Sequence, residues 1–351
     1  MLQQRTATVL RSITKQYIAR AVPISSASIV GESGLDVSSA TIRNEMVFLE
    51  NDGYIIRPHH AAGSIPSDKG YRYYVGTLSH IELPLAEKRL IDHLFHQVED
   101  NLEEWLGLAV TLLAQRVQNV AVITMPKPPA CKLKHLELVS LQDRLALLVI
   151  VLHGAILRQQ LINFDEPVLQ AEFTAIAGRL NQVYAELPAS RIATKEEKFT
   201  AAEARITDCL LKIMQTEDER GYEEPYLDGL HYLMNQPEFS GGGQRISGLV
   251  SLIEQRKLMD MILPELFNDY DVSVAIGREN KQEAIQDYSV VIGRYGLIDE
   301  AVGTIAIIGP TRMPYARTIS TIDYMTSMMS RLVADLYRGG TTKNNQWVNG
   351  N

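Results

Sequence analysis

The sequence predicts an α+β protein of several domains, and three observations lead to this prediction. The first is a helix-turn-helix pattern within residues 24–72, which a short hairpin completes. The second is a group of strand-like apolar runs that a charged helical stretch interrupts and that then resumes. The third is the length of 351 residues, which is typical of two or three domains.

The N-terminal helix is predicted over residues 5–20, because apolar side chains recur there at helical spacing. Pro23 ends this helix and begins the next segment, since proline interrupts a helix interior. Two shorter helices follow, and they are expected to meet across a turn at residues 34–36. The buried stripe of the first helix is predicted as Leu10, Ile13 and Tyr17.

The second short helix is predicted to start at the cap formed by Ser38 and Ser39. It runs to about residue 51, and Gly53 ends it. At about 100° per residue, its larger apolar side chains fall on one face, which we expect to be buried. That stripe consists of Ile42, Met46 and Leu49.

The opposite face of this helix carries side chains that suit nucleic-acid recognition. Asn44 lies there with Ala40 and Val47, and Thr41 and Arg43 flank it. A helix that enters the major groove of DNA needs a slim leading end, hydroxyls for phosphates, and an Arg or Asn that grips a base edge in two places. Arg43 and Asn44 are therefore predicted base contacts, although on an isolated helix they would be ordinary surface residues.

The two serines at the start of this helix have two roles open to them. As caps, Ser38 and Ser39 accept hydrogen bonds from free backbone N–H groups. The same helix terminus favours a phosphate anion. Both serines, and the hydroxyl of Thr41, are therefore also predicted to contact the DNA backbone.

A two-stranded wing is predicted over residues 54–56 and 64–66. It is too short to fold alone, so it must pack on the helices. The Lys and Arg side chains beside the wing can neutralise the negative charge of DNA phosphates. His59 and His60 have no Cys or carboxylate at ligand spacing, so no metal site is predicted. The predicted DNA contacts of this region are Arg57, His60, Lys69 and Arg72.

The remaining elements follow from the apolar periodicity. A helical exit segment is expected at 69–80, a boundary at Pro84, and one long helix at 86–117. Strands that neighbour one another in an antiparallel sheet are expected at 120–124, 136–141, 145–152 and 157–164. Charged helices are expected over 167–239, with a flexible joint at 241–243. Beyond them we expect a helix at 246–262, strands at 272–276, 288–295 and 302–308, and a closing helix at 314–337.

Two turns each have two interpretations. At the turn around Thr311 and Arg312, the side chains could hold an anion, or Thr311 could cap a helix while Arg312 anchors a carboxylate. The structural interpretation is favoured there, and also at residues 277–280.

The charge of the chain is unevenly distributed. The formal net charge is −8. Residues 1–80 contain eight Lys and Arg and six Asp and Glu, or +2, so the remainder carries −10. A weakly positive segment joined to an acidic remainder is compatible with a DNA-binding domain attached to a domain that does not bind DNA.

Enzymatic and membrane functions find little support in the sequence. It contains no nucleophile elbow, Walker loop, HExxH motif or paired catalytic carboxylates, so no enzyme activity, catalytic residue or cofactor is predicted. The N-terminus has no apolar signal core, and the longest apolar run, Leu145–Leu152, is too short to span a bilayer. Two cysteines cannot form a disulfide framework. A cytoplasmic location is expected.

Four stretches of the chain resemble the HrcA-type heat-inducible transcription repressors of bacteria. They are Val37–Met46, Leu49–Ile55, Ala62–Val75 and Val302–Arg317. The chain departs from the family pattern where Ala27 and Ser64 stand, since the family usually carries Arg at both positions. These departures put two DNA contacts in doubt and leave the second helix of the motif unchanged.

The resemblance implies a fold and a function. It implies a winged helix-turn-helix, followed by a GAF-like domain that hosts an inserted, mainly helical dimerisation domain. It also implies a homodimer that represses chaperonin and chaperone operons at an inverted repeat of double-stranded DNA, is released on heat stress, and has the chaperonin as a partner. The expected divisions are a DNA-binding domain at 1–80, a helical linker at 81–118, GAF-like parts at 119–166 and 244–340, the insertion at 167–243 and a disordered tail at 341–351.

Two other functions remain open from the sequence. One is a metabolite-responsive transcription regulator that senses a small ligand in the GAF-like domain, which a ligand-dependent thermal shift would reveal. The other is an enzyme with an accessory DNA-binding domain, which the absence of catalytic spacing disfavours.

Overall fold

The structure is a computed structural model with two compact units. The first unit contains residues 1–125, 224–295 and 303–351, and the second contains residues 126–223 and 296–302. We call residues 2–78 the head, the rest of the first unit the body, and the second unit the insert. Every helix of the described residues is too short or too polar to cross a bilayer. The described residues are 2–30, 37–59, 63–78, 81–98, 101–127, 130–153, 156–195, 199–219, 225–239, 243–254, 258, 272–297 and 301–337.

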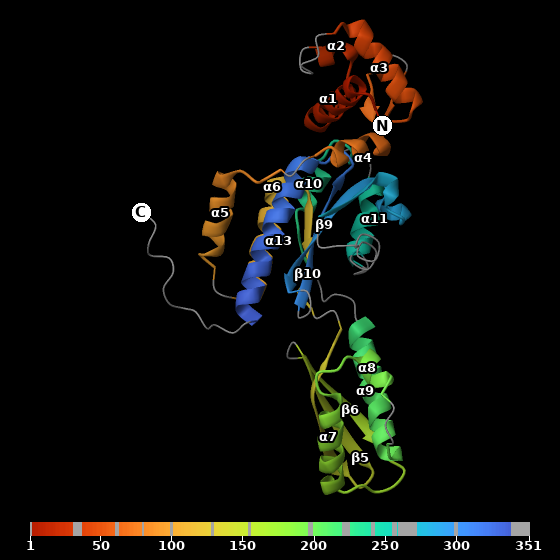
Figure 1. The fold of residues 1–351 in the computed structure, drawn as a ribbon, viewed down its shortest axis with the longest axis vertical. Coiled ribbons are helices and arrows are strands. Elements are labelled where there is room, and N and C mark those ends of the chain that lie inside the picture. Colours follow the sequence, from red (N-terminus) through yellow and green to blue (C-terminus); the bar gives the residue numbers. More distant parts are fainter. Residues whose placement is uncertain are drawn as a thin grey trace. The chain divides into compact units, whose positions relative to one another are not determined.

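The head combines helices with a short hairpin (Figure 1). Serine caps begin two of the helices, because Ser38 Oγ accepts from Thr41 N and Ser67 Oγ accepts from Gly70 N, each at 3.2 Å. The turn expected at residues 34–36 lies outside the described residues. The elements of the head are α1 (Gln4–Arg20), α2 (Ser26–Val30), α3 (Ser39–Asn51), β1 (Ile55–Ile56), β2 (Ile65–Pro66) and α4 (Asp68–Gly76).

The core of the head joins α1, α2 and α3 with the hairpin. The stripe predicted for α3 is confirmed, since all three of its side chains are buried. In α1 two of the three predicted side chains are buried, and the third, Tyr17, is half-buried. The core consists of Val9, Leu10, Ile13, Ile24, Ile29, Ile42, Met46, Leu49 and Ile55.

The hairpin is fixed to the segment that precedes α2. Ile24 N donates to Ser64 O at 2.9 Å, and Ser64 N donates to Ile24 O at 2.8 Å. A Cβ atom at Gly63 would lie 2.5 Å from the backbone of Ile24, so this close approach requires glycine. The prediction that the hairpin packs on the rest of the head is therefore confirmed.

Two helices replace the single long helix that was expected after Pro84. They are α5 (Leu85–Phe95) and α6 (Leu102–Val117). The side chain of Asn101 accepts a hydrogen bond from Glu103 N at 3.0 Å and caps a new helix there. The apolar periodicity runs through both helices, which is why it gave no sign of the break.

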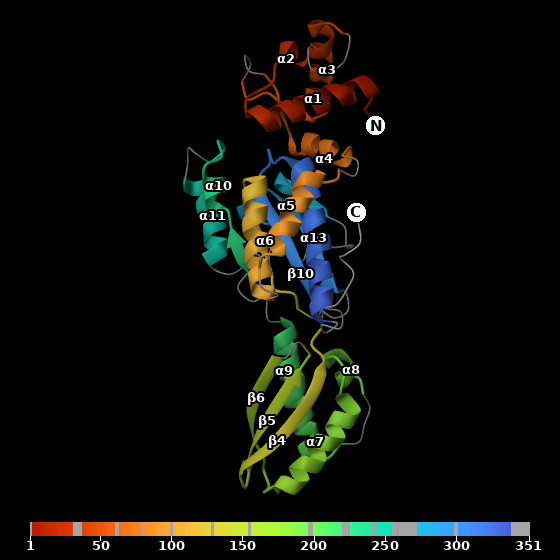
Figure 2. The same ribbon diagram turned by 90° about the vertical axis from the view of Figure 1, so that its left-hand side faces the viewer.

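The body is built on a five-stranded sheet in the order β7-β3-β10-β9-β8. Helices α6 and α13 pack together and share one core with the sheet (Figures 1 and 2). The segment expected to be wholly helical before residue 239 supplies an edge strand, β7, which pairs with β3 through Leu227 and Val122. The elements of the body are β3 (Val120–Ile123), β7 (Tyr226–Asp228), α10 (Leu230–Met234), α11 (Gly243–Glu254), β8 (Ser273–Ile276), two short 3-10 turns (Gly277–Glu279 and Glu283–Ile285), β9 (Tyr288–Leu297), β10 (Ala301–Pro310) and α13 (Tyr315–Tyr337).

The insert has a separate three-stranded sheet in the order β4-β5-β6. The expectation that these strands lie beside β3 in one sheet is therefore wrong. The second compact unit begins at Pro126 and combines this sheet with helices, whereas the insertion was expected over residues 167–243, which are mainly helical here too. Its elements are β4 (Leu133–Gln142), β5 (Leu145–Leu152), β6 (Ile156–Asn163), α7 (Gln170–Tyr184), α8 (Ala189–Ala193) and α9 (Ala201–Glu219).

The two faces of the insert sheet differ. One face packs its apolar side chains against α7 and α9 (Figure 2). On the other, Leu147 stands opposite both Val139 and Leu161, and Val151 stands opposite Leu157. Leu157 is 55% exposed and Leu161 53% exposed, so apolar surface is presented there to solvent. We call this the open face, and it consists of Val139, Leu147, Val149, Val151, Leu157 and Leu161.

A carboxylate fastens α3 to α1 within the head. Glu45 accepts hydrogen bonds from Arg5 Nε at 2.7 Å and from Thr6 Oγ1 at 2.6 Å. The hydrogen bond from Thr6, followed by the contact with Arg5, lowers the pKa of Glu45. The orientation of α3 therefore depends on this carboxylate as well as on the apolar core.

Substitution Glu45→Gln is expected to lower the free energy of unfolding by about 1 kcal/mol at neutral pH, because charge-assisted hydrogen bonds become neutral ones. Since the folded pKa is lowered, the stabilisation is complete above 4.5, the ordinary pKa of this group, and is lost as the pH falls through the lowered value. Urea unfolding followed by circular dichroism across this pH range measures the difference.

The matched control for this prediction is Glu104→Gln, which changes an exposed glutamate of α6. It is expected to leave stability unchanged within about 0.5 kcal/mol. A Glu45→Gln effect that is the same at every pH would contradict the role of the carboxylate charge.

Candidate nucleic-acid interface

The outward face of α3 is determined by what its opposite face buries. Ile42 and Leu49 are fully buried against the core of the head. The helical repeat then turns Arg43 and Asn44 to solvent, and both are exposed. Neither lies in the protein interior, so both remain available for contact with a partner.

The hydroxyl groups at the start of α3 form a small cluster. Ser38 Oγ lies 3.0 Å from Thr41 Oγ1, and Ser39 Oγ lies 3.2 Å from Ser26 Oγ on α2. Ser38 is exposed, and the other three are partly exposed. The cap predicted at Ser38 is present, and this end of the helix offers hydroxyls close to free backbone N–H groups, which is a suitable arrangement for a phosphate.

Two of the predicted cations gather at the other end of α3. Arg57 Nε lies 3.2 Å from Glu50 Oε2, and both side chains are about one-third exposed. Lys69 Nζ donates to Asp52 O at 2.7 Å and lies 4.2 Å from the ring centroid of Tyr54. Cations near a helix C-terminus stabilise the free carbonyl groups there. His60, which was also predicted, lies outside the described residues.

Arg72 contacts the body in this structure, which the sequence did not predict. Its Nε donates to Glu279 Oε1 at 2.7 Å, and its Nη2 donates to Val274 O at 2.6 Å and also to Glu279. The hydrogen bonds with Glu279 raise the pKa of Arg72. Arg72 thus forms a contact between the head and the body, and its contact with DNA stays a prediction.

No pattern in the sequence indicates this contact between α4 and the body. Asp68 Oδ2 accepts from Arg278 N at 3.0 Å. A Cβ atom at Gly277 would lie 2.4 Å from the same oxygen, and Gly277 has a φ of +55°, so glycine is required there. We call Asp68, Arg72, Gly277 and Glu279 the α4 joint. Its residues belong to a turn and a helix whose pairing no local pattern indicates.

Arg312 provides a second attachment for the head. Its Nη1 donates to Ile18 O on α1 at 2.8 Å, and its Nε donates to Glu238 Oε1 at 2.6 Å. The prediction that Arg312 anchors a carboxylate is therefore confirmed. Its contact with α1 was not predicted, because the two residues lie far apart in the sequence.

The two departures from the family pattern lie in different surroundings. Ala27 is exposed on α2, so an arginine there would extend into solvent. Ser64 is fully buried, and its Oγ has no hydrogen-bond partner within the described protein. Position 64 is therefore part of the bridge to Ile24 instead of an outward projection of the hairpin.

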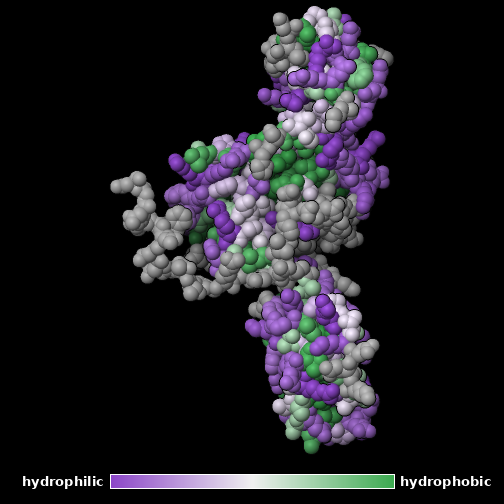
Figure 3. Space-filling view, in the orientation of Figure 1, coloured by the Kyte–Doolittle hydropathy of each residue, from purple (hydrophilic) through white to green (hydrophobic). Residues whose placement is uncertain are grey.

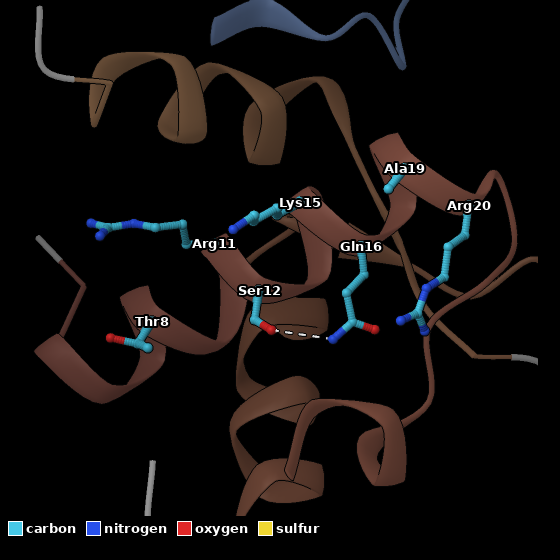
Figure 4. Close-up of a pocket in the computed structure, with 7 residues that line it drawn as sticks. All are labelled: Thr8, Arg11, Ser12, Lys15, Gln16, Ala19 and Arg20. Carbon is cyan, nitrogen blue, oxygen red and sulfur yellow. Dashed lines mark hydrogen bonds between the residues drawn. The ribbon is translucent and has the colours of Figure 1, made fainter. Parts of the chain in front are cut away.

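The outer side of α1 carries a cationic hollow that the sequence analysis missed. Figure 4 shows Arg11, Lys15 and Arg20 spread along this side of the helix, with Gln16 between them. Gln16 Nε2 donates to Ser28 O at 3.2 Å, which connects α1 to α2. The buried stripe of α1 faces α3, so these cations are separate from the outward face of α3.

A second hollow lies beside α3. Asn44 and Phe48 line it from α3, together with Leu2, Tyr54 and neighbouring residues of the head. Among the described residues, no group of three or more His, Cys, Asp or Glu side chains could hold a metal ion. The chemistry that the head offers is therefore that of exposed polar side chains and backbone donors, which suits the binding of a polyanion.

Comparison with known proteins gives consistent results along the chain. The family described as HrcA protein C terminal domain matches residues 103–319. A heat-inducible transcription repressor HrcA of Dehalococcoides mccartyi is 53% identical over 337 residues, which cover 96% of this chain and 97% of the relative. The protein of the same description from Roseiflexus castenholzii is 36% identical over 345 residues, 96% of each chain.

One solved structure, described as a hypothetical protein, has a similar fold. It has a TM-score of 0.57 and 22% sequence identity, and the match covers 95% of this chain and 98% of that one. The family match spans more than half of the chain, and the relatives match it along nearly its whole length. The chain therefore belongs to the HrcA family of heat-inducible transcription repressors.

Proposed function

We propose that this chain is a dimeric repressor that binds an inverted-repeat operator through α3 of each head. In this proposal the head is a winged helix-turn-helix, with α2 and α3 as the motif and the β1–β2 hairpin as the wing. The observation that carries it is the outward face of α3, where Arg43 and Asn44 are exposed opposite a fully buried stripe. Two such helices would enter successive major grooves.

The polar side chains predicted to contact DNA each receive a role in this proposal. Arg43 and Asn44 contact base edges, since both can bind a base in two places. Ser38, Ser39 and Thr41 contact phosphates at the leading end of α3. The exposed cations at the far end, Arg57 and Lys69, bind the backbone and add affinity that depends on salt. His60 remains a predicted contact.

The open face of the insert supports dimerisation. Val139, Leu157 and Leu161 are exposed on the two edge strands, and the apolar side chains between them on β5 are half-buried. An apolar patch of this kind marks a surface that another protein covers. A second copy of the same sheet face offers the same apolar side chains, so a twofold symmetric contact satisfies both at once. We therefore place the homodimer contact on the sheet of the insert instead of on the helical segment 167–243.

The resemblance to the family extends the proposal to the body and to the target. The five-stranded sheet with α6 and α13 is assigned as the GAF-like domain. The operator is assigned to the region upstream of chaperonin and chaperone operons, with release on heat stress and the chaperonin as a partner. A physical route for release is loss of the dimer at raised temperature, because a single head holds only one half-site.

Arg43→Ala and Asn44→Ala are each expected to weaken binding to the DNA upstream of the chaperonin operon by about 1–3 kcal/mol. A footprint and a titration on that DNA and on random DNA measure this loss. The control is Arg89→Ala, which removes an exposed cation of α5 and is expected to leave the footprint unchanged. Equal losses on both DNAs would reassign the two side chains to phosphate contact.

Leu161→Lys is expected to convert the dimer to a monomer, because it places a charge on the open face beside Leu147 of the central strand. Sedimentation velocity measures the mass of the particle. Gln160→Lys changes the neighbouring exposed residue of the same strand, whose side chain points to the other face of the sheet, and is expected to leave the dimer intact. A dimer that survives Leu161→Lys would move the contact elsewhere.

Heating the purified protein to the heat-shock temperature is expected to reduce its operator affinity and its dimer mass together, without chaperonin. Fluorescence anisotropy with labelled operator and light scattering on the same sample follow both quantities. Cooling in the presence of chaperonin is expected to restore them. Full affinity and full dimer mass at that temperature would exclude the direct thermal route.

A further inference from the structure

The outward face of α3 exposes two apolar side chains beside its polar pair. Val47 is 43% exposed and Phe48 is 48% exposed. The space-filling view shows hydrophobic surface on the head at the position of α3 (Figure 3). Neither side chain belongs to the buried stripe of this helix, so packing within the head does not account for them.

The two apolar side chains have different surroundings. Val47 follows Asn44 by three residues and Arg43 by four, so it lies one turn further along the helix and between them. Phe48 is turned to the flank, where it lines the hollow beside Leu2 and Tyr54. Val47 therefore occupies the centre of the face that carries the two predicted base contacts, and Phe48 lies at its edge.

A solvated helix gains little from valine at such a position. Valine has a lower helix propensity than alanine, lysine or glutamate, because its branched side chain is restricted against the preceding turn. A valine exposed between two polar side chains gains free energy when a partner covers it with apolar surface. In the major groove, the methyl group that a base presents is the C5 methyl of thymine, beside hydrogen-bond donors and acceptors.

We propose that Val47 contacts the C5 methyl of a thymine adjacent to the bases that Arg43 and Asn44 bind. Val47 thereby selects thymine at that position of each half-site. The inference rests on the proposed function, because it requires α3 to lie in the major groove. Arg43 and Asn44 bind hydrogen-bonding groups, so they cannot detect a methyl group. Val47 adds this discrimination, because cytosine and thymine differ at this edge in the methyl group as well as in the exocyclic donor or acceptor.

Replacing thymine by uracil in the operator tests this contact, because it removes the methyl group and leaves every hydrogen-bonding group in place. The wild-type protein is expected to bind the uracil operator about fourfold more weakly for each half-site, the value of one buried methyl group. Val47→Ala is expected to bind the thymine operator more weakly by a similar factor and to lose the difference between the two DNAs.

Two further variants separate the contact from a change in folding. Val47→Thr keeps the branched shape and one of the two γ-methyl groups, so it is expected to retain part of the discrimination that Val47→Ala loses. Phe48→Ala is the matched control, and it is expected to keep the fourfold difference. Circular dichroism and the dimer mass verify that each variant is folded.

Uracil interference locates the contacted base. Operator that contains uracil at random single positions is divided into bound and free DNA, and cleavage at uracil then reveals the depleted positions. Uracil at one thymine position of each half-site is expected to be depleted from the DNA bound by wild type and to be retained in the DNA bound by Val47→Ala.

The possible results test the role of Val47 and the proposed function separately. A specific footprint with equal affinity for thymine and uracil operators overturns the role of Val47 and leaves the proposed function standing. Loss of discrimination in Phe48→Ala, with Val47→Ala unchanged, also overturns it. Absence of any specific footprint by the wild-type protein overturns the proposed function itself.

Discussion

The burial of one side of α3 is the constraint from which the functional surface follows. The helix is too short to be stable alone, so it persists because Ile42, Met46 and Leu49 pack into the core of the head. The same packing fixes its rotation about its own axis. Arg43, Asn44 and Val47 are presented outward for that reason, and Glu45 holds the helix in place from the side. The exposure of the outward face of α3 thus depends on the stability of a very small core.

The head is also coupled to the body by polar contacts of high specificity. In the α4 joint, the carboxylate of Asp68 accepts a hydrogen bond from a backbone N–H of the body. The guanidinium of Arg72 donates to the carboxylate of Glu279 and to a backbone carbonyl. Beside it, the buried Tyr71 packs against Tyr315 with ring centroids 5.9 Å apart. Such contacts depend on geometry more than apolar packing does, since a small displacement breaks them. They offer a route by which a change in the body alters how the head is held.

Local rules explain which parts of the structure the sequence could predict. The cap at Ser38 and the stripe of α3 depend on neighbours within one or two turns, and both were predicted correctly. No local sequence pattern indicates which distant segments of the chain contact one another. The contact between Arg72 and Glu279 was not predicted, because the two residues lie 207 positions apart. The strands of the insert were placed beside β3 because alternation identifies a strand and says nothing about its neighbour. The short strand β7 was missed within a charged helical stretch for the same reason.

The contact between Arg312 and the carbonyl of Ile18 has a consequence for biosynthesis. The two residues are separated by 294 positions. The head has all the side chains of its core once residue 55 has been translated, and N-terminal segments fold first during synthesis. The arginine that fastens α1 is translated 294 positions after its partner on α1. A nascent chain therefore contains the core of the head well before it contains the side chain that attaches α1 to the body. A ribosome stalled between the two positions would release a fragment that has the exposed face of α3 and lacks this attachment.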